Sequence, residues 1–178
     1  MRYLKYTILS IIIIIVIFVI NTLTNPTSPF ETVTFTKGDL KLEVEYSRPY
    51  KKNRLIFGNK NEDALVPFNE YWRTGANSAT IFSTNKEIKF GDKNLPSGRY
   101  RLYTIPNLTT WKININSESS TFFAISEPDY SKDLISIEIE STQNENSLEQ
   151  FTMDFINTNS TQSLRMRWDK VEVVIPIN

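Results

Sequence analysis

Apolar and polar residues alternate along much of this chain, and this two-residue period limits the possible folds more than any other feature of the sequence. In the clearest example Leu40, Leu42, Val44 and Tyr46 alternate with charged residues at positions 41, 43 and 45. Because successive side chains of a β-strand point to opposite faces of a sheet, this segment has one apolar and one charged face. Residues 36–39 (Thr-Lys-Gly-Asp) precede it and predict a hairpin turn.

Similar segments follow to the end of the chain. They lie at residues 79–84, 87–90, 99–105, 111–115, 134–139, 151–155, 164–168 and 171–177, with turn-forming residues at 91–94, 96–98 and 157–161. After residue 33 no convincing apolar stripe with the 3.6-residue period of a helix is present. The sequence therefore predicts an all-β fold, an antiparallel β-sandwich or open barrel of about 8–10 strands, whose strand order stays open.

The N-terminal segment has a different pattern. Residues 6–20 carry no charge, and residues 11–20 are an unbroken apolar run. With its neutral neighbours this run extends to about 20 residues, the length that a helix needs to cross a bilayer. Arg2 and Lys5 precede the run, and basic flanking residues stay on the cytoplasmic side. We therefore expect one N-terminal transmembrane helix, with the rest of the chain exported.

This pattern divides the chain into four parts. They are a cytoplasmic tip at residues 1–5, a transmembrane signal-anchor at 6–24, a linker at 25–32 and an extracytoplasmic β domain at 33–178. The expected localisation is the inner (cytoplasmic) membrane, crossed once, with the C-terminal domain in the periplasm. A cleaved signal peptide is the alternative and leads to the same export, although Thr22 and Thr24 match the small residues of a cleavage site poorly.

Two residue types are missing from the sequence, which contains no Cys and no His. Thiol nucleophiles, disulfides, Cys/His zinc sites and imidazole-dependent catalytic triads are therefore excluded. The 20 basic and 20 acidic residues balance, which argues against nucleic acid as a partner because phosphate binding needs a basic excess. No metal-binding or nucleotide-binding motif is present, so we expect no cofactor and no metal.

Residues 47–78 interrupt the regular alternation. A segment of this length without a clear period is uncommon in a compact domain and usually has a use. It contains the basic residues Lys51, Lys52 and Arg54, and it ends with the block Trp-Arg-Thr-Gly-Ala-Asn at residues 72–77. Its apolar residues predict a packed loop or short helical turns.

The motifs of this segment resemble those of a known family. They are Tyr-Ser-Arg-Pro at 46–49, Ile-Phe-Gly at 56–58, Val-Pro at 66–67, the block at 72–77 and Leu-Pro-Ser-Gly-x-Tyr at 95–100. The chain is similar over residues 33–178 to bacterial exported proteins known as domain of unknown function 2911 (DUF2911). The resemblance implies an envelope-located β domain and brings no activity. Asn53 stands where many members have Gly, a tolerable change if the turn needs a positive φ angle.

The candidate binding residues belong to this segment: Arg48, Trp72, Arg73, Thr74 and Asn77. In one interpretation the two guanidinium groups converge with Thr74 and Asn77 on an anionic or carbonyl-bearing ligand. In the other, each arginine is tied to a carboxylate or to loop carbonyls and holds the loop against the sheet. Gly75 is expected to provide a left-handed backbone conformation, and Asn77 is expected either to tolerate the same geometry or to cap the following segment.

The hypothesis for function is a non-enzymatic module of the cell envelope, anchored in the membrane, that binds a glycan, a peptide or an envelope protein through residues 47–79. The alternative is a carbohydrate-active hydrolase that uses Asp or Glu carboxylates. A purely structural role is the third possibility. No catalytic residue is assigned, because the paired acids at 43 and 45 and at 138 and 140 lie on the charged faces of amphipathic segments.

Overall fold

The computed structural model describes residues 2–24, 27–119, 126–158 and 161–178. One helix, α1 (Arg2–Thr24), precedes a β domain. The strands of the domain are β1 (Phe30–Lys37), β2 (Leu40–Ser47), β3 (Phe57–Gly58), β4 (Val66–Pro67), β5 (Thr80–Thr84), β6 (Ile88–Phe90), β7 (Lys93–Leu95), β8 (Gly98–Pro106), β9 (Thr110–Asn116), β10 (Asp133–Thr158) and β11 (Thr161–Ile177). Short 3-10 turns at Lys60–Glu62 and Tyr130–Lys132 complete it.

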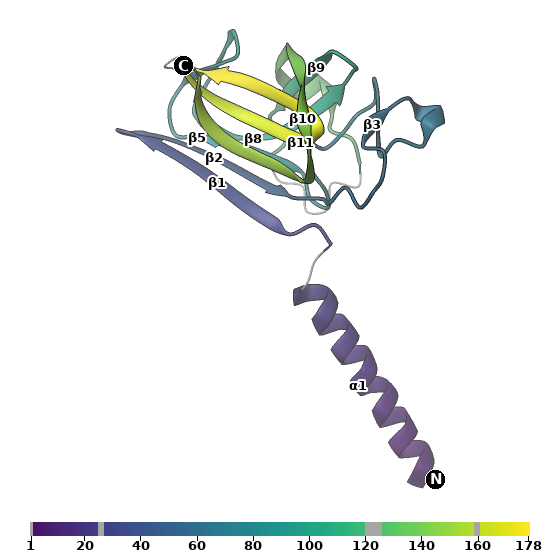
Figure 1. Ribbon diagram of the computed structural model, residues 1–178. Coiled ribbons are helices and arrows are strands. Elements are labelled where there is room, and N and C mark those ends of the chain that lie inside the picture. The colour runs from purple at the N-terminus through teal and green to yellow at the C-terminus, as the bar shows by residue number, and fades with distance from the viewer. Residues whose placement is uncertain (1, 25–26, 120–125, 159–160) are drawn as a thin grey trace.

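Nine strands form one strongly bent sheet in the order β1-β2-β5-β8-β9-β10-β11-β6-β7. The first part of β10 pairs with β9, and its later part pairs with β11, so this one strand belongs to both layers of a sandwich. Figure 1 shows β10 and β11 lying over the layer of β1, β2, β5 and β8. The prediction of a mostly antiparallel β fold is confirmed, and only the short pair β3–β4 is parallel among the described strands.

The expected turns lie where the sequence places them. Lys37 pairs with Leu40, so Gly38 and Asp39 form the two-residue connection between β1 and β2, and Gly38 has a φ angle of 56°. Gly91, with a φ angle of 63°, opens the equally short connection between β6 and β7. Part of the turn expected at 157–161 lies outside the described residues.

The prediction of separate strands at 134–139 and 151–155 was wrong, as was that of separate strands at 164–168 and 171–177. Each pair forms one continuous strand, because residues 141–143 and Leu148 still pair across the β10–β11 hairpin. The register shifts on both sides of Leu148, and such bulges let a strand bend without ending. The bend carries β10 from one layer to the other.

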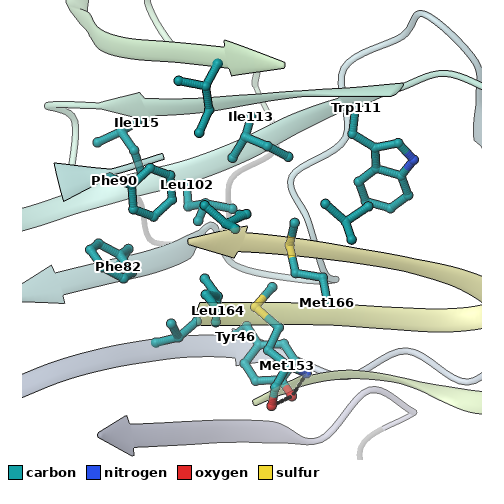
Figure 2. Packing of buried hydrophobic residues seen from close by; sticks show 14 of the residues in the cluster. Tyr46, Phe82, Phe90, Leu102, Trp111, Ile113, Ile115, Met153, Leu164 and Met166 are labelled. Carbon is teal, nitrogen blue, oxygen red and sulfur yellow. Dashed lines mark hydrogen bonds between the residues drawn. The ribbon is translucent and has the colours of Figure 1, made fainter. Parts of the chain in front are cut away.

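The core lies between the two layers. Tyr46, Phe82, Leu102 and Ile113 of one layer face Met153, Leu164 and Met166 of the other, as Figure 2 shows. Leu42, Val44 and Tyr46 of β2 are fully buried, as the alternation predicted. At about 25 cal/mol per Å² of apolar surface removed from water, this packing is the main stabilising contribution.

The helix α1 exposes its apolar side chains. The side chains from Ile11 to Ile20 are between 46% and 69% exposed. Figure 1 shows the helix standing apart from the sheets. Over the described part of the chain, no helix combines the length and the apolarity needed to cross a membrane. The membrane-spanning segment at 6–24 stays a prediction.

Candidate functional site

The long segment between β2 and β5 is packed onto one end of the sandwich. Ile56 and Val66 are buried, and the β3–β4 pair brings Phe57 under the indole rings of the core. The ring of Phe57 lies 5.8 Å from that of Trp72 and 6.1 Å from that of Trp168, measured between centroids. These ring contacts hold Trp72, the first residue of the Trp-Arg-Thr-Gly-Ala-Asn block, in place.

Trp72 forms a two-hydrogen-bond bridge to β8. Its amide donates to the carbonyl of Thr104 at 2.8 Å, and the amide of Thr104 donates back at 3.0 Å. Next to it Thr74 has a φ angle of 58°, and its hydroxyl donates to the hydroxyl of Thr104 at 3.1 Å. At Gly75 a Cβ atom would lie 2.9 Å from the carbonyl oxygen of Ser47, so only glycine fits. The block is therefore a tight backbone turn anchored to the sheet.

Asn77 attaches the linker to this turn. Its φ angle is 58°, a conformation that asparagine tolerates, and its side-chain amide donates to the carbonyl of Ser28 at 3.3 Å. The expectation of left-handed backbone at Gly75 and Asn77 is confirmed, and Asn53 has a positive φ angle of 58° as well. The linker thus runs alongside the block.

A cavity of about 400 Å³ lies between the block, the linker and β11. Its lining residues are Thr27, Ser28, Pro49, Tyr50, Arg54, Leu65, Val66, Tyr71, Trp72, Arg73, Gly75, Ala76 and Trp168. This volume is within the range of small-molecule sites, which are mostly apolar with a few polar groups. The lining has that character, with four aromatic side chains and two guanidinium groups.

The two guanidinium groups in the lining have carbonyl partners and no carboxylate partner. Arg54 donates to the carbonyls of Lys51 and Tyr50, at 3.0 and 2.5 Å. Arg73 donates from Nη1 to the carbonyl of Asn77 at 2.7 Å. Among the described residues neither arginine forms an ion pair, and no Asp or Glu is in the lining. The cavity is therefore electropositive.

A third guanidinium lies behind the cavity wall. Arg101 of β8 is 1% exposed, and its Nη2 donates to the hydroxyl of Tyr71 and to the carbonyl of Ser126. Its Cζ lies 5.7 Å from the centroid of the Tyr71 ring, a cation–π contact. Its Nε has no hydrogen-bond partner, and it forms no ion pair within the described ranges. Tyr71 thus separates the cavity from a buried positive charge.

Next to Arg101 a tyrosine cluster covers the same outer face of the sheet. Burial and a 2.6 Å hydrogen bond to Asp133 raise the pKa of Tyr103 far above its ordinary value. Burial and a hydrogen bond to Glu127 raise the pKa of Tyr130 to about 12. Hydrogen bonds from Lys132 lower the pKa of Glu118. Each of these shifts moves a pKa away from neutrality, whereas a general acid or base needs a pKa close to it.

The residues expected from the sequence do not all meet at the cavity. Trp72 and Arg73 line it, whereas Arg48, Thr74 and Asn77 are not in the lining. Arg48 forms an ion pair with Glu31 at 3.0 Å and donates to the carbonyl of Phe151. The binding role proposed for these five residues stays a prediction. Within the described residues no group of three or more acidic side chains could hold a metal ion.

The sequence reasoning missed several residues of this region, chiefly Tyr50, Trp168 and Arg101. Arg54 was noticed only as part of a basic stretch. Position 168 ends an alternating segment, and that pattern gave its indole ring no role. A partial signal existed for Arg101, since four of the five residues that follow it in β8 are apolar or aromatic.

Comparison with known proteins gives one match. Residues 28–177 match the sequence profile of a family described as a protein of unknown function, DUF2911. No curated protein and no solved structure matches the chain.

Proposed function

This chain belongs to the DUF2911 family, and from that premise we propose that it is a non-enzymatic binding module of the cell envelope. In this proposal the cavity beside residues 72–77 binds a glycan fragment or a peptide, and the N-terminal segment holds the domain at the outer face of the inner membrane. The observation that carries it is the cavity itself, an open site with aromatic walls and two guanidinium groups that lack carboxylate partners in the described part of the chain.

The chemistry of the site favours binding over catalysis. A hydrolase of the glycosidase type needs two carboxyl groups on either side of the scissile bond, about 5–10 Å apart. None of the described residues that line the cavity is Asp or Glu. The residues that do line it offer hydrogen-bond donors and ring faces, which orient a ligand without activating a nucleophile.

The exposed apolar side chains of α1 support the proposed anchor. A run of ten apolar residues in contact with water is unfavourable, and a lipid environment would cover it. The basic residues Arg2 and Lys5 give the orientation. The anchor is tested by extracting membranes of expressing cells with alkaline carbonate and by sequencing the N-terminus. Retention in the pellet with an intact N-terminus is expected, whereas a mature protein that starts near residue 25 would contradict it.

The binding function is tested by thermal unfolding of the full chain in mild detergent, against a panel of sugars, cell-wall fragments and short peptides. A ligand at one hundred times its dissociation constant adds about 2.7 kcal/mol of stability, which raises the melting temperature by roughly 5–10 °C for a domain of this size. Arg73→Gln should abolish the shift. Arg99→Gln is the matched control, because Arg99 is exposed on β8 and is absent from the cavity lining. If no compound in the panel shifts the wild-type protein, the proposed function is wrong.

A further inference from the structure

We infer that the ligand of this cavity is a ring-bearing organic anion of the acidic-sugar class, whose carboxylate binds Arg54 and Arg73. This inference rests on the proposed function and specifies its substrate.

The positive charge of the residues that line the cavity indicates an anionic ligand. Among the described residues, those that line the space of about 400 Å³ include two arginines and no Asp or Glu. In this protein the arginines outside the cavity are commonly paired, as Arg48 is with Glu31 and Arg165 with Asp154. Arg54 and Arg73 use backbone carbonyls instead, which hold the side chains in place and leave their charge uncompensated. A bound anion would compensate it.

The two arginines also keep N–H donors free for a ligand. A guanidinium group has five N–H donors. Among the described residues, the hydrogen bonds of Arg73 use one nitrogen, Nη1, and those of Arg54 use Nε and Nη2. Donors of both side chains therefore remain for a ligand, in the fork geometry that matches a carboxylate.

Arg101, next to Tyr71, adds to the positive electrostatic potential of the cavity. It is buried, its Nε is unpartnered, and its guanidinium bonds the hydroxyl of Tyr71, with Cζ 5.7 Å from the ring centroid. A charge in a low-dielectric interior acts over a longer range than one in water. A negative group in the cavity would thus be stabilised by three guanidinium groups, one of them shielded from solvent.

The aromatic side chains that line the cavity indicate a ligand that contains a ring. Tyr50 and Tyr71 are partly exposed in the lining, and the more deeply buried Trp72 and Trp168 form its inner surface. Such faces contact the C–H surface of a sugar ring, while the hydroxyls of Thr27 and Ser28 at the rim suit a ligand that carries hydroxyl groups. A small inorganic anion would leave these walls unused.

One set of titrations measures separately what the charge and the ring of the ligand contribute to binding. It uses the full chain in mild detergent, with tryptophan fluorescence as the readout. The probes are methyl glucuronoside (ring and charge), methyl glucoside (ring alone), acetate and phosphate (charge alone), and short-chain phosphatidylglycerol with phosphatidylcholine as its neutral control. We expect methyl glucuronoside to bind at least about tenfold more tightly than any other probe. We also expect its affinity to fall as salt is added, because screening weakens charge pairing.

Substitutions of the two arginines test where the carboxylate of the ligand binds. Arg54→Gln and Arg73→Gln should each weaken glucuronoside binding by about tenfold or more, with Arg73→Lys between wild type and Gln because it keeps the charge and loses the fork. Arg99→Gln should leave the affinity unchanged. Melting temperatures of all variants are measured alongside, so that a folding defect is recognised.

The outcomes distinguish this inference from the proposed function. Equal binding of the glucoside and the glucuronoside would overturn the role of charge and leave the binding module intact. Equal binding of acetate or phosphate would overturn the role of the ring, and preferential binding of phosphatidylglycerol would replace the sugar with a lipid headgroup. If none of these probes binds while a neutral peptide or glycan does, the inference falls and the proposed function stands.

Discussion

Arg48 illustrates how a single side chain can fasten a loop to a sheet. Its Nε lies 3.0 Å from Glu31, its Nη2 donates to the hydroxyl of Thr152 at 2.9 Å, and its amide donates to the carbonyl of Pro29. These partners belong to β1, β10 and the linker. The side chain therefore ties β1 to β10, and the backbone amide of the same residue holds the linker.

Replacing Arg48 by Gln should lower the free energy of unfolding by about 1–3 kcal/mol, because Thr152 and the Phe151 carbonyl lose their donor. Lys86→Gln is the control, since the pair of Lys86 with Asp39 is largely exposed and such pairs contribute about 0–1 kcal/mol. Urea denaturation followed by circular dichroism measures both. Loss of ligand affinity without loss of stability in the Arg48 variant would mean that the side chain binds ligand and is not a structural tie.

Local backbone requirements could be predicted from single residues. Gly75 and Asn77 were expected to have left-handed backbone, and Asn53 was judged able to replace glycine, because these residue types tolerate positive φ angles. The partners of Arg48 could not be predicted. A guanidinium group reaches any acceptor within a few ångströms, and the acceptors here come from residues about one hundred positions away.

At the scale of the elements, the long hairpin of β10 and β11 depends on an irregularity near its middle. Asp169 has a φ angle of 52° and interrupts the regular pairing of β11. Its carboxylate accepts from the Lys51 ammonium at 2.5 Å and from the Ser147 hydroxyl at 2.6 Å. Burial raises the pKa of Asp169, but the hydrogen bonds from Lys51 and Ser147 outweigh it and lower the pKa overall. The pair ties the loop after β2 to the bend of the hairpin.

Asp169→Asn should therefore destabilise the protein by about 1–2 kcal/mol at neutral pH, while keeping a residue that tolerates the positive φ angle. A carboxyl group with a lowered pKa in the folded state stabilises the fold above its unfolded pKa, and this stability is lost as the pH falls through the folded value. The difference between wild type and variant should thus shrink below a pH of about 4. Urea titrations at several pH values check this.

Asp39→Asn is the matched control, because Asp39 is 89% exposed in its side chain and its loss should change stability little at any pH. A constant difference between wild type and Asp169→Asn across the acid range would show that the charge of Asp169 contributes nothing.

At the scale of the whole molecule, buried tyrosines connect the layers. Tyr46 of β2 donates to Glu31, and its hydroxyl accepts from the amide of Met153 at 2.7 Å across the core. Tyr103, on the outer face of the sheet, donates from its hydroxyl to the carboxylate of Asp133. The pKa of each is raised, mainly by burial, and the pKa of Tyr130 is raised to about 12. Ionisation of these hydroxyls in the folded protein would therefore reduce its stability.

The protein should consequently lose stability in alkali. Folded tyrosines with a raised pKa contribute stability that is complete below the unfolded value of about 10 and is lost as the pH rises through the folded values. The melting temperature should fall steeply between pH values of about 10 and 12, together with the appearance of tyrosinate absorbance. Tyr103→Phe should lower the melting temperature at neutral pH and flatten the alkaline decline. An unchanged alkaline profile in this variant would contradict the role of Tyr103.

The sequence by itself determined the properties that depend on neighbouring residues. The two-residue period assigned the buried face of β2, glycine placed the connections of the β1–β2 and β6–β7 hairpins, and the absence of Cys and His removed whole classes of chemistry. The tertiary structure alone decided that β10 serves both layers, that Trp168 meets Trp72 at the cavity and that Arg101 lies behind Tyr71. The physical reason is that periodicity and turn propensity act between residues adjacent in the chain, whereas strand order and converging side chains arise from contacts between segments far apart in it.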